Sequence, residues 1–85
     1  MTIKPNTVTS PQRRLKLGNI IYDGKDDSFS IAEIEWDGRK GIGIRWNGSK
    51  AKDVKGNPVS RGYPTWFVVP EELELSILNA VKKLK

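Results

Sequence analysis

Cationic and aromatic side chains are interleaved in the middle of this chain. Residues 39–62 contain seven Lys or Arg and one Asp, and Trp36, Trp46 and Tyr63 lie within or beside them. Cations hold phosphates while rings stack on unpaired bases, so the pattern is typical of a groove for single-stranded nucleic acid. The candidate contact residues are Trp36, Arg39, Arg45, Lys50, Lys52, Arg61, Lys16 and Tyr63.

Catalytic chemistry is limited, because the 85 residues include neither Cys nor His. Thiolate, imidazole, zinc-ribbon and Ser-His mechanisms are therefore excluded. Asp26 and Asp27 are two adjacent acids in a predicted turn, which is too few to predict a metal site. We expect a protein that is not an enzyme and that uses no cofactor, no metal ion and no small-molecule substrate.

The length and the formal net charge of +5 indicate one small basic domain. No stretch approaches the ~20 apolar residues of a membrane span, and the first residues lack a signal-peptide pattern. We therefore expect an intracellular protein of the cytoplasm or nucleoid, or of the nucleus in a eukaryote. A core this short supplies only roughly 3–5 kcal/mol, so we expect dimerisation to add stability.

Alternation and turn residues predict the elements that position these side chains. Residues 1–14 are predicted to be a flexible basic arm, and residues 15–85 a domain that binds single-stranded nucleic acid. Strands are expected over 15–22, 28–36, 39–46 and 64–69, with a kink or bulge at Gly18 and a long loop over 47–62. A helix is expected from Pro70, with Glu first and Lys last, as the helix dipole favours. Its apolar arc is wider than one sheet face needs, which indicates a second copy of the helix as partner.

The turn after Trp36 decides which side chains share a face. If Asp37 and Gly38 form a two-residue turn, Trp36, Arg39 and Arg45 share one face, open to a flat ligand. The opposite face then holds the core under the helix, made of Phe29, Ile31, Ile42, Ile44 and Trp46. A slip of one residue would give a more apolar common face, made of Ile34, Trp36, Ile42, Ile44 and Trp46. Two further core candidates, necessarily on opposite faces, are Trp66 and Phe67.

Several short motifs follow one another in a recognisable order. Leu17-Gly18 precedes the hairpin run Trp36-Asp37-Gly38-Arg39, which is followed by Ile44-Arg45 and by the helix start Val69-Pro70-Glu71. In order and spacing they resemble the single-stranded-DNA-binding domain of transcriptional positive cofactor four and its bacterial and phage relatives. The resemblance covers residues 15–84. It departs from the family at Pro64-Thr65, where a basic residue followed by Gly is usual.

The resemblance implies an α+β fold, in which a strongly bent four-stranded antiparallel sheet is followed by one C-terminal helix that pairs two copies as a homodimer. It also favours the two-residue turn. Single-stranded DNA would bind along the open sheet face with little sequence preference, in transcription, as for a coactivator, or in replication or recombination. Trp36 would be the stacking ring, and Arg39 and Arg45 would contact phosphate or bases. RNA is a possible ligand as well.

Other functions fit the same composition. An SH3-like interaction module would bind a peptide through Trp36, Trp46 and Tyr63, with an affinity insensitive to salt. A small ribonuclease toxin would use Lys, Arg and Tyr, although such toxins need helices before the sheet. The basic segment would also be compatible with an ordinary solvated loop and sheet edge.

Overall fold

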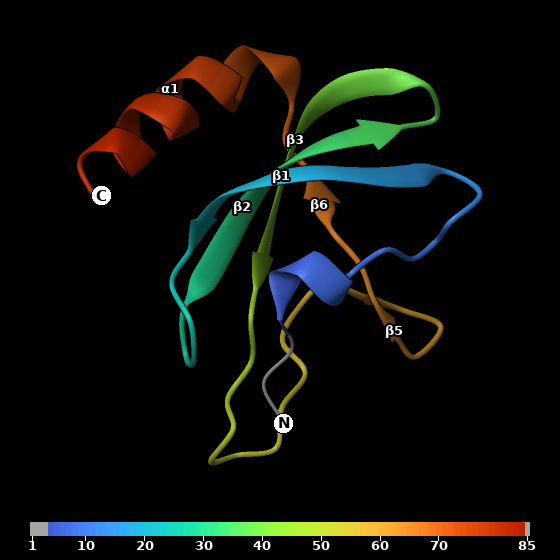
Figure 1. Cartoon of the computed structure of the whole chain (residues 1–85), viewed down its shortest axis with the longest axis vertical. Coiled ribbons are helices and arrows are strands. Elements are labelled where there is room, and N and C mark those ends of the chain that lie inside the picture. The colour runs from blue at the N-terminus through green and yellow to red at the C-terminus, as the bar shows by residue number, and fades with distance from the viewer. Residues whose placement is uncertain (1–3, 85) are drawn as a thin grey trace.

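The computed structural model describes residues 4–84, which fold into a bent sheet with one α-helix (Figure 1). The sheet is antiparallel, in the order β1 (Leu15–Asp23), β2 (Phe29–Trp36), β3 (Arg39–Trp46) and β6 (Phe67–Val68). A separate hairpin is formed by β4 (Val59–Ser60) and β5 (Tyr63–Pro64). The 3-10 helix η1 (Pro5–Thr7) precedes the sheet, and α1 (Glu71–Lys82) follows it. The predicted α+β class, a four-stranded antiparallel sheet followed by a C-terminal helix, is confirmed. No helix in residues 4–84 is long and apolar enough to cross a membrane.

The β2–β3 hairpin has the register that a two-residue turn produces. Trp36 pairs with Arg39, and the ladder continues without a shift to Phe29 opposite Trp46. Asp37 and Gly38 have φ angles of 52° and 83°, the positive values that a type I′ turn requires. The slipped register is therefore excluded.

The pairing of strand β1 with β2 is irregular. Its pairing shifts by one residue between Leu17 and Ile20 and again between Ile20 and Tyr22, and such bulges increase local twist. A Cβ at Gly18 would lie 3.1 Å from the carbonyl oxygen of Glu33, so glycine permits the close approach of the two strands. The predicted irregularity at Gly18 is confirmed, whereas the second shift had no signal in the sequence.

Helix α1 covers one face of the sheet, which we call the helix-side face. Pro70 is its N-cap, three Glu lie in its first turn and Lys82 in its last, which is the polarity that the helix dipole favours. Its inner side chains pack into an apolar cluster with the sheet, made of Ile31, Ile42, Val69 and Val81, with Ile77 and Leu78 beside them. The predicted pairing of the helix with this face is correct for Ile31 and Ile42.

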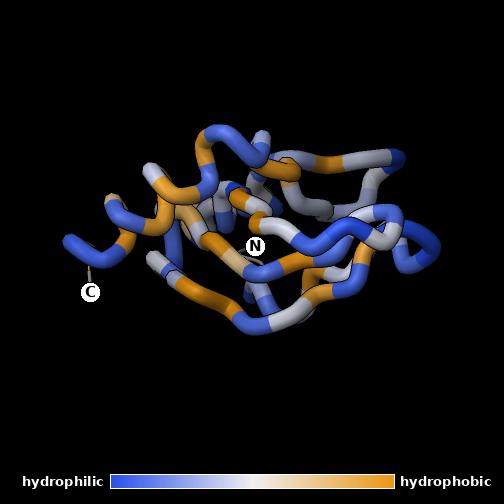
Figure 2. Tube along the Cα trace, turned by 90° about the horizontal axis from the view of Figure 1, so that it is seen from above, coloured by the Kyte–Doolittle hydropathy of each residue, from blue (hydrophilic) through white to orange (hydrophobic). Residues whose placement is uncertain are grey.

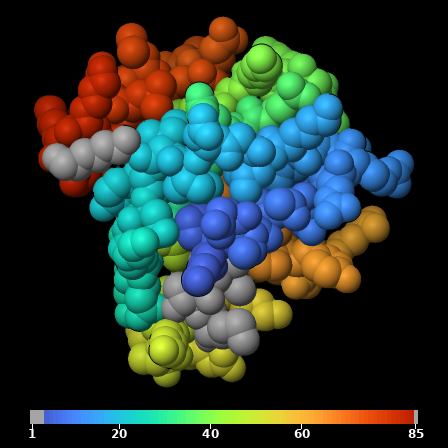
Figure 3. All heavy atoms as spheres, in the orientation of Figure 1, coloured from blue at the N-terminus to red at the C-terminus, as the bar shows by residue number. Residues whose placement is uncertain are grey.

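The opposite face, which we call the arm-side face, is covered as well. Val8 is 2% exposed, and its carbonyl accepts a hydrogen bond of 2.9 Å from the indole Nε1–H of Trp66. Both residues belong to a second apolar cluster with Leu15, Ala32 and Ile34. Figures 1 and 3 show the N-terminal segment lying against β1 on this side. The expectation of an open face here is wrong.

The segment predicted as a flexible arm supplies that cover. Pro5 and Val8 are buried, so residues 4–14 lie against the sheet in this structure, and residues 1–3 of the predicted arm are outside the described residues. The sequence gives little indication that this segment packs on the sheet, because it contains few apolar residues and two prolines. Buried Pro5 and Val8, together with the Val8 carbonyl bonded to Trp66, attach this segment to the sheet.

Helix α1 leaves part of the helix-side face uncovered. Figure 1 shows α1 at one end of the molecule and the loop that follows β3 at another, and Figure 2 shows the C-terminal helix at one side. Trp46, at the end of β3, is 56% exposed, and Phe67 is 57% exposed. The expectation that both belong to the core is therefore corrected, whereas Trp66 is buried as predicted.

Candidate functional site

The predicted contact residues are distributed over several places instead of one groove. Trp36 and Arg39 lie at the turn of the β2–β3 hairpin. Arg45 is buried, and Lys16 on β1 lies 3.8 Å from Glu35. The remaining four lie beyond β3 and are exposed: Lys50, Lys52, Arg61 and Tyr63.

A cleft of about 320 Å³ separates the hairpin turn from the start of α1, and we call it the hairpin cleft. Trp36 is half-buried in its wall, and Arg39 and Lys40 line it beside two carboxylates of the helix, Glu71 and Glu74. Arg39 lies 3.8 Å from Glu71. The two carboxylates offset the two cations, so the hairpin cleft lacks the net positive charge that attracts phosphate.

Arg45 points into the protein from the arm-side face of β3. It is 2% exposed, its Nη1 donates to the carbonyl of Thr65 at 2.6 Å and its Nη2 to the carbonyl of Lys55 at 2.7 Å. Its buried Nε has no partner among residues 4–84. Burial lowers the pKa of Arg45 from the ordinary arginine value. The expectation that Arg39 and Arg45 project from one open surface is wrong, because the Arg45 guanidinium holds two backbone segments inside the fold.

One aromatic side chain from each strand of the sheet lies at the end of the helix-side face farthest from the hairpin turn. We call these four the aromatic row: Tyr22, Phe29, Trp46 and Phe67. The ring centroids of Tyr22 and Phe29 are 5.2 Å apart, and those of Phe29 and Trp46 are 6.1 Å apart. Phe67 joins the same face because it pairs with Ile44 across β3 and β6.

A recess of about 400 Å³ opens among the rings of this row, and we call it the aromatic recess. Apolar side chains make most of its wall: Phe29, Ile44, Trp46, Pro58 and Phe67. Asn57 also lines it, and the backbone of Asn57 is bonded to that of Trp46 in both directions, at 2.8 and 3.2 Å. Sequence reasoning placed most of these rings in the core. Nothing in the sequence indicated how much of this face α1 covers.

The segment after Trp46, residues 47–58, carries Lys50, Lys52 and Lys55 against the single acid Asp53, and we call it the basic loop. All three lysines are exposed. The loop is attached to the β1–β2 turn, because the backbone N–H of Lys50 donates to Asp26 Oδ1 at 2.7 Å. Further along the chain, Tyr63 is 65% exposed at the β4–β5 hairpin.

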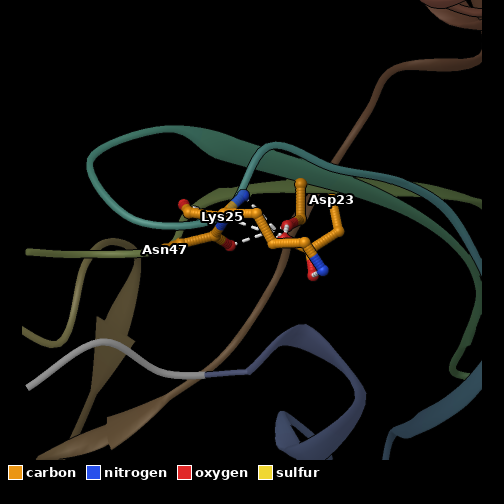
Figure 4. A network of polar contacts seen from close by, with 4 residues as sticks. Asp23, Lys25 and Asn47 are labelled. Carbon is orange, nitrogen blue, oxygen red and sulfur yellow. Dashed lines mark hydrogen bonds and ion pairs between the residues drawn. The ribbon is translucent and has the colours of Figure 1, made fainter. Parts of the chain in front are cut away.

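A buried polar network fastens the start of the basic loop (Figure 4). Asn47 is fully buried, and its Oδ1 accepts a hydrogen bond of 2.7 Å from Ser30 Oγ. Its Nδ2 donates to the carbonyl of Lys25 at 2.9 Å and to Asp23 Oδ1 at 3.3 Å. Lys25 Nζ in turn lies 3.4 Å from Asp23 Oδ2. The β1–β2 turn and the basic loop are thus joined beside the aromatic row.

No protein-family model, curated protein or solved structure matches the chain. Within the described residues, no group of three or more Asp or Glu could hold a metal ion. The features from which function can be inferred are therefore the aromatic row, its recess and the basic loop.

Proposed function

We propose that the protein binds single-stranded nucleic acid, DNA in the first place, with the aromatic row and the basic loop as the contact surface. The supporting observation is that two large rings, Trp46 and Phe67, are more than half exposed where β3 leads directly into the basic loop. Exposed rings adjoining a cationic segment combine base stacking with neutralisation of phosphates. RNA offers the same two groups and is a second ligand for the same surface.

In this proposal the contact residues differ in part from those that the sequence indicated. Lys50 and Lys52 keep their expected role, and Arg61 and Tyr63 extend the surface along the β4–β5 hairpin. Trp46 takes the stacking role expected of Trp36, and Arg45 acts inside the fold. The protein is not an enzyme in this proposal. It serves inside the cell in transcription, replication or recombination, as the resemblance implies.

We also propose a homodimer formed through α1. Leu73 and Leu75 are 51% and 70% exposed on two sides of the helix, about 160° apart around its axis, and Leu84, just after the helix, is 52% exposed. Leu78 packs against the protein's own sheet. Two such helices packed antiparallel across a two-fold axis would place the acidic first turn of each beside the basic last turn of the other. Sedimentation equilibrium tests this arrangement. A species of twice 9.6 kDa is expected, and a monomer at all concentrations would contradict it.

The function is tested by fluorescence-anisotropy titration of the full chain with labelled DNA of about 16 nucleotides, the upper end of single-strand site sizes. We expect tighter binding to the single strand than to the duplex. If Lys50, Lys52 and Lys55 each neutralise one phosphate, the logarithm of the affinity should fall with the logarithm of salt with a slope of about −2. Equal affinity for the duplex, or no binding, would refute the proposal. Salt-insensitive binding of a peptide would favour the interaction module instead.

A further inference from the structure

We propose that the aromatic recess seats one unpaired base of the bound strand, which enters between Trp46 and Phe67 instead of lying flat on the row. This inference rests on the proposed function and specifies how one nucleotide is held. The recess measures about 400 Å³, toward the lower end of the ~300–1,000 Å³ typical of small-ligand sites. That size suits one planar group better than a longer segment of chain.

The walls suit a planar ligand. The rings of Phe29 and Trp46 meet edge to face, with an angle of 81° between their planes. Ile44 lies between them and Phe67, with which it pairs. A base in this space can stack on one ring and touch the edge of another, whereas a flat platform offers stacking alone.

Arg45 keeps two of these walls at a fixed separation. Its Nη2 holds the carbonyl of Lys55, close in sequence to Asn57 and Pro58, and its Nη1 holds the carbonyl of Thr65, two residues before Phe67. Both bonds are short and the guanidinium is 2% exposed. A buried cation without a carboxylate partner is costly, and here it fixes the distance between the segments on either side of the recess. The recess is therefore built into the fold.

Charge indicates which occupant fits. Residues 46–62 carry four Lys or Arg and one Asp, so a second copy of this face would meet like charge. An apolar peptide side chain would fill the recess and leave the lysines without partners. A nucleotide strand supplies a planar group for the recess and phosphates for the basic loop.

The rim of the recess adds one polar group. Asn57 is exposed, and its side-chain amide has no hydrogen-bond partner in the part of the chain that the structure describes. An amide both donates and accepts, as the edge of every base does. Asn57 can thus bond a seated base from the open side.

The test compares the affinity of the full chain for a base-bearing oligonucleotide with that for an abasic phosphodiester chain of equal length. The wild-type protein should prefer the base-bearing strand by about 5- to 150-fold, the range that corresponds to stacking of one base. Ile44→Phe should fill the recess while leaving Trp46 and Phe67 in place, and should abolish most of this preference. Val68→Phe is the matched control, because it adds the same ring to the adjacent strand on the arm-side face and should keep the preference.

A second variant guards against misfolding at Ile44, which is partly in the core. Asn57 is exposed, so Asn57→Leu should narrow the recess from its rim with a side chain that has no ring to stack, and should reduce the same preference without disturbing the fold. An unchanged preference in both variants, with strand binding retained, would overturn the recess and leave the proposed function standing. Absence of strand binding by the wild-type protein would overturn both.

Discussion

The hairpin cleft and the aromatic recess each combine a tryptophan at a strand end with nearby cations, but their neighbours differ. At the hairpin cleft, the acidic first turn of α1 faces Arg39, and Trp36 is half-buried. At the recess, Trp46 is 56% exposed and leads into a loop with three lysines and one acid. An aromatic-basic motif therefore does not define a binding surface by itself, because the charge of the neighbouring element decides which ligands can approach.

The largest expected effect is the difference in stability between alanine variants of two adjacent aromatic residues, Trp66 and Phe67. Trp66 is 3% exposed on the arm-side face and bonded to Val8, so Trp66→Ala should lower the free energy of unfolding by about 3–5 kcal/mol. Phe67→Ala should change it far less, because its ring is 57% exposed, yet it should weaken binding to a single strand. Urea denaturation with parallel oligonucleotide titration measures both. Equal losses of stability would remove the distinction between the faces.

The next effect compares the two tryptophans of the two sites. Trp46→Ala should weaken binding to single-stranded DNA by about 1–3 kcal/mol, the loss of one stacked base. Trp36→Ala should leave affinity nearly unchanged while lowering stability, because Trp36 packs against the arm-side cluster. Anisotropy titrations of both variants under one condition decide the matter. A larger loss of affinity in Trp36→Ala than in Trp46→Ala would instead support the hairpin cleft as the binding site.

The smallest effect distinguishes a cation that meets phosphate from one that acts inside the fold. Lys52→Ala should reduce the magnitude of the salt slope by about 0.7 with little change in stability. Arg45→Met should leave the slope unchanged and destabilise the fold by about 1–3 kcal/mol, because it deprives the carbonyls of Lys55 and Thr65 of their donor. Titration over a range of salt concentrations, paired with thermal unfolding, provides both readouts. A reduced slope in Arg45→Met would show that this guanidinium reaches the ligand.

Local signals were sufficient for β1, β2, β3 and α1. They failed for residues 64–69, which were expected as one strand but divide between β5 and β6, and for the expected loop over 47–62, which contains β4. Asp37-Gly38 specified the hairpin register, because few other residue pairs accept two positive φ angles in succession. Pro70 followed by Glu marked the start of α1, and alternation placed Ile31 and Ile42 under it. Each of these features depends on neighbours within a few residues or on a single turn.

The sequence did not indicate which segments cover each face of the sheet. Alternation assigns Arg45 to a face, but only the tertiary structure shows that Val8 and Trp66 close that face. Trp46 was assigned to the core for the same reason, on its hydrophobicity alone, although it is 56% exposed. Its exposure follows from the position of α1, which packs around Ile42 and Val81 and leaves the end of β3 uncovered.

The network around Asn47 has a consequence for motion. Because one amide bridges the turn after β1 and the loop after β3, neither can open without releasing the other. Hydrogen exchange of their backbone amides should therefore give one common free energy of opening, as for one cooperative unit. If a nucleic-acid strand bound to the basic loop and made it more rigid, the β1–β2 turn would become more rigid with it. The loss of conformational entropy would then be that of one unit and not of two independent segments.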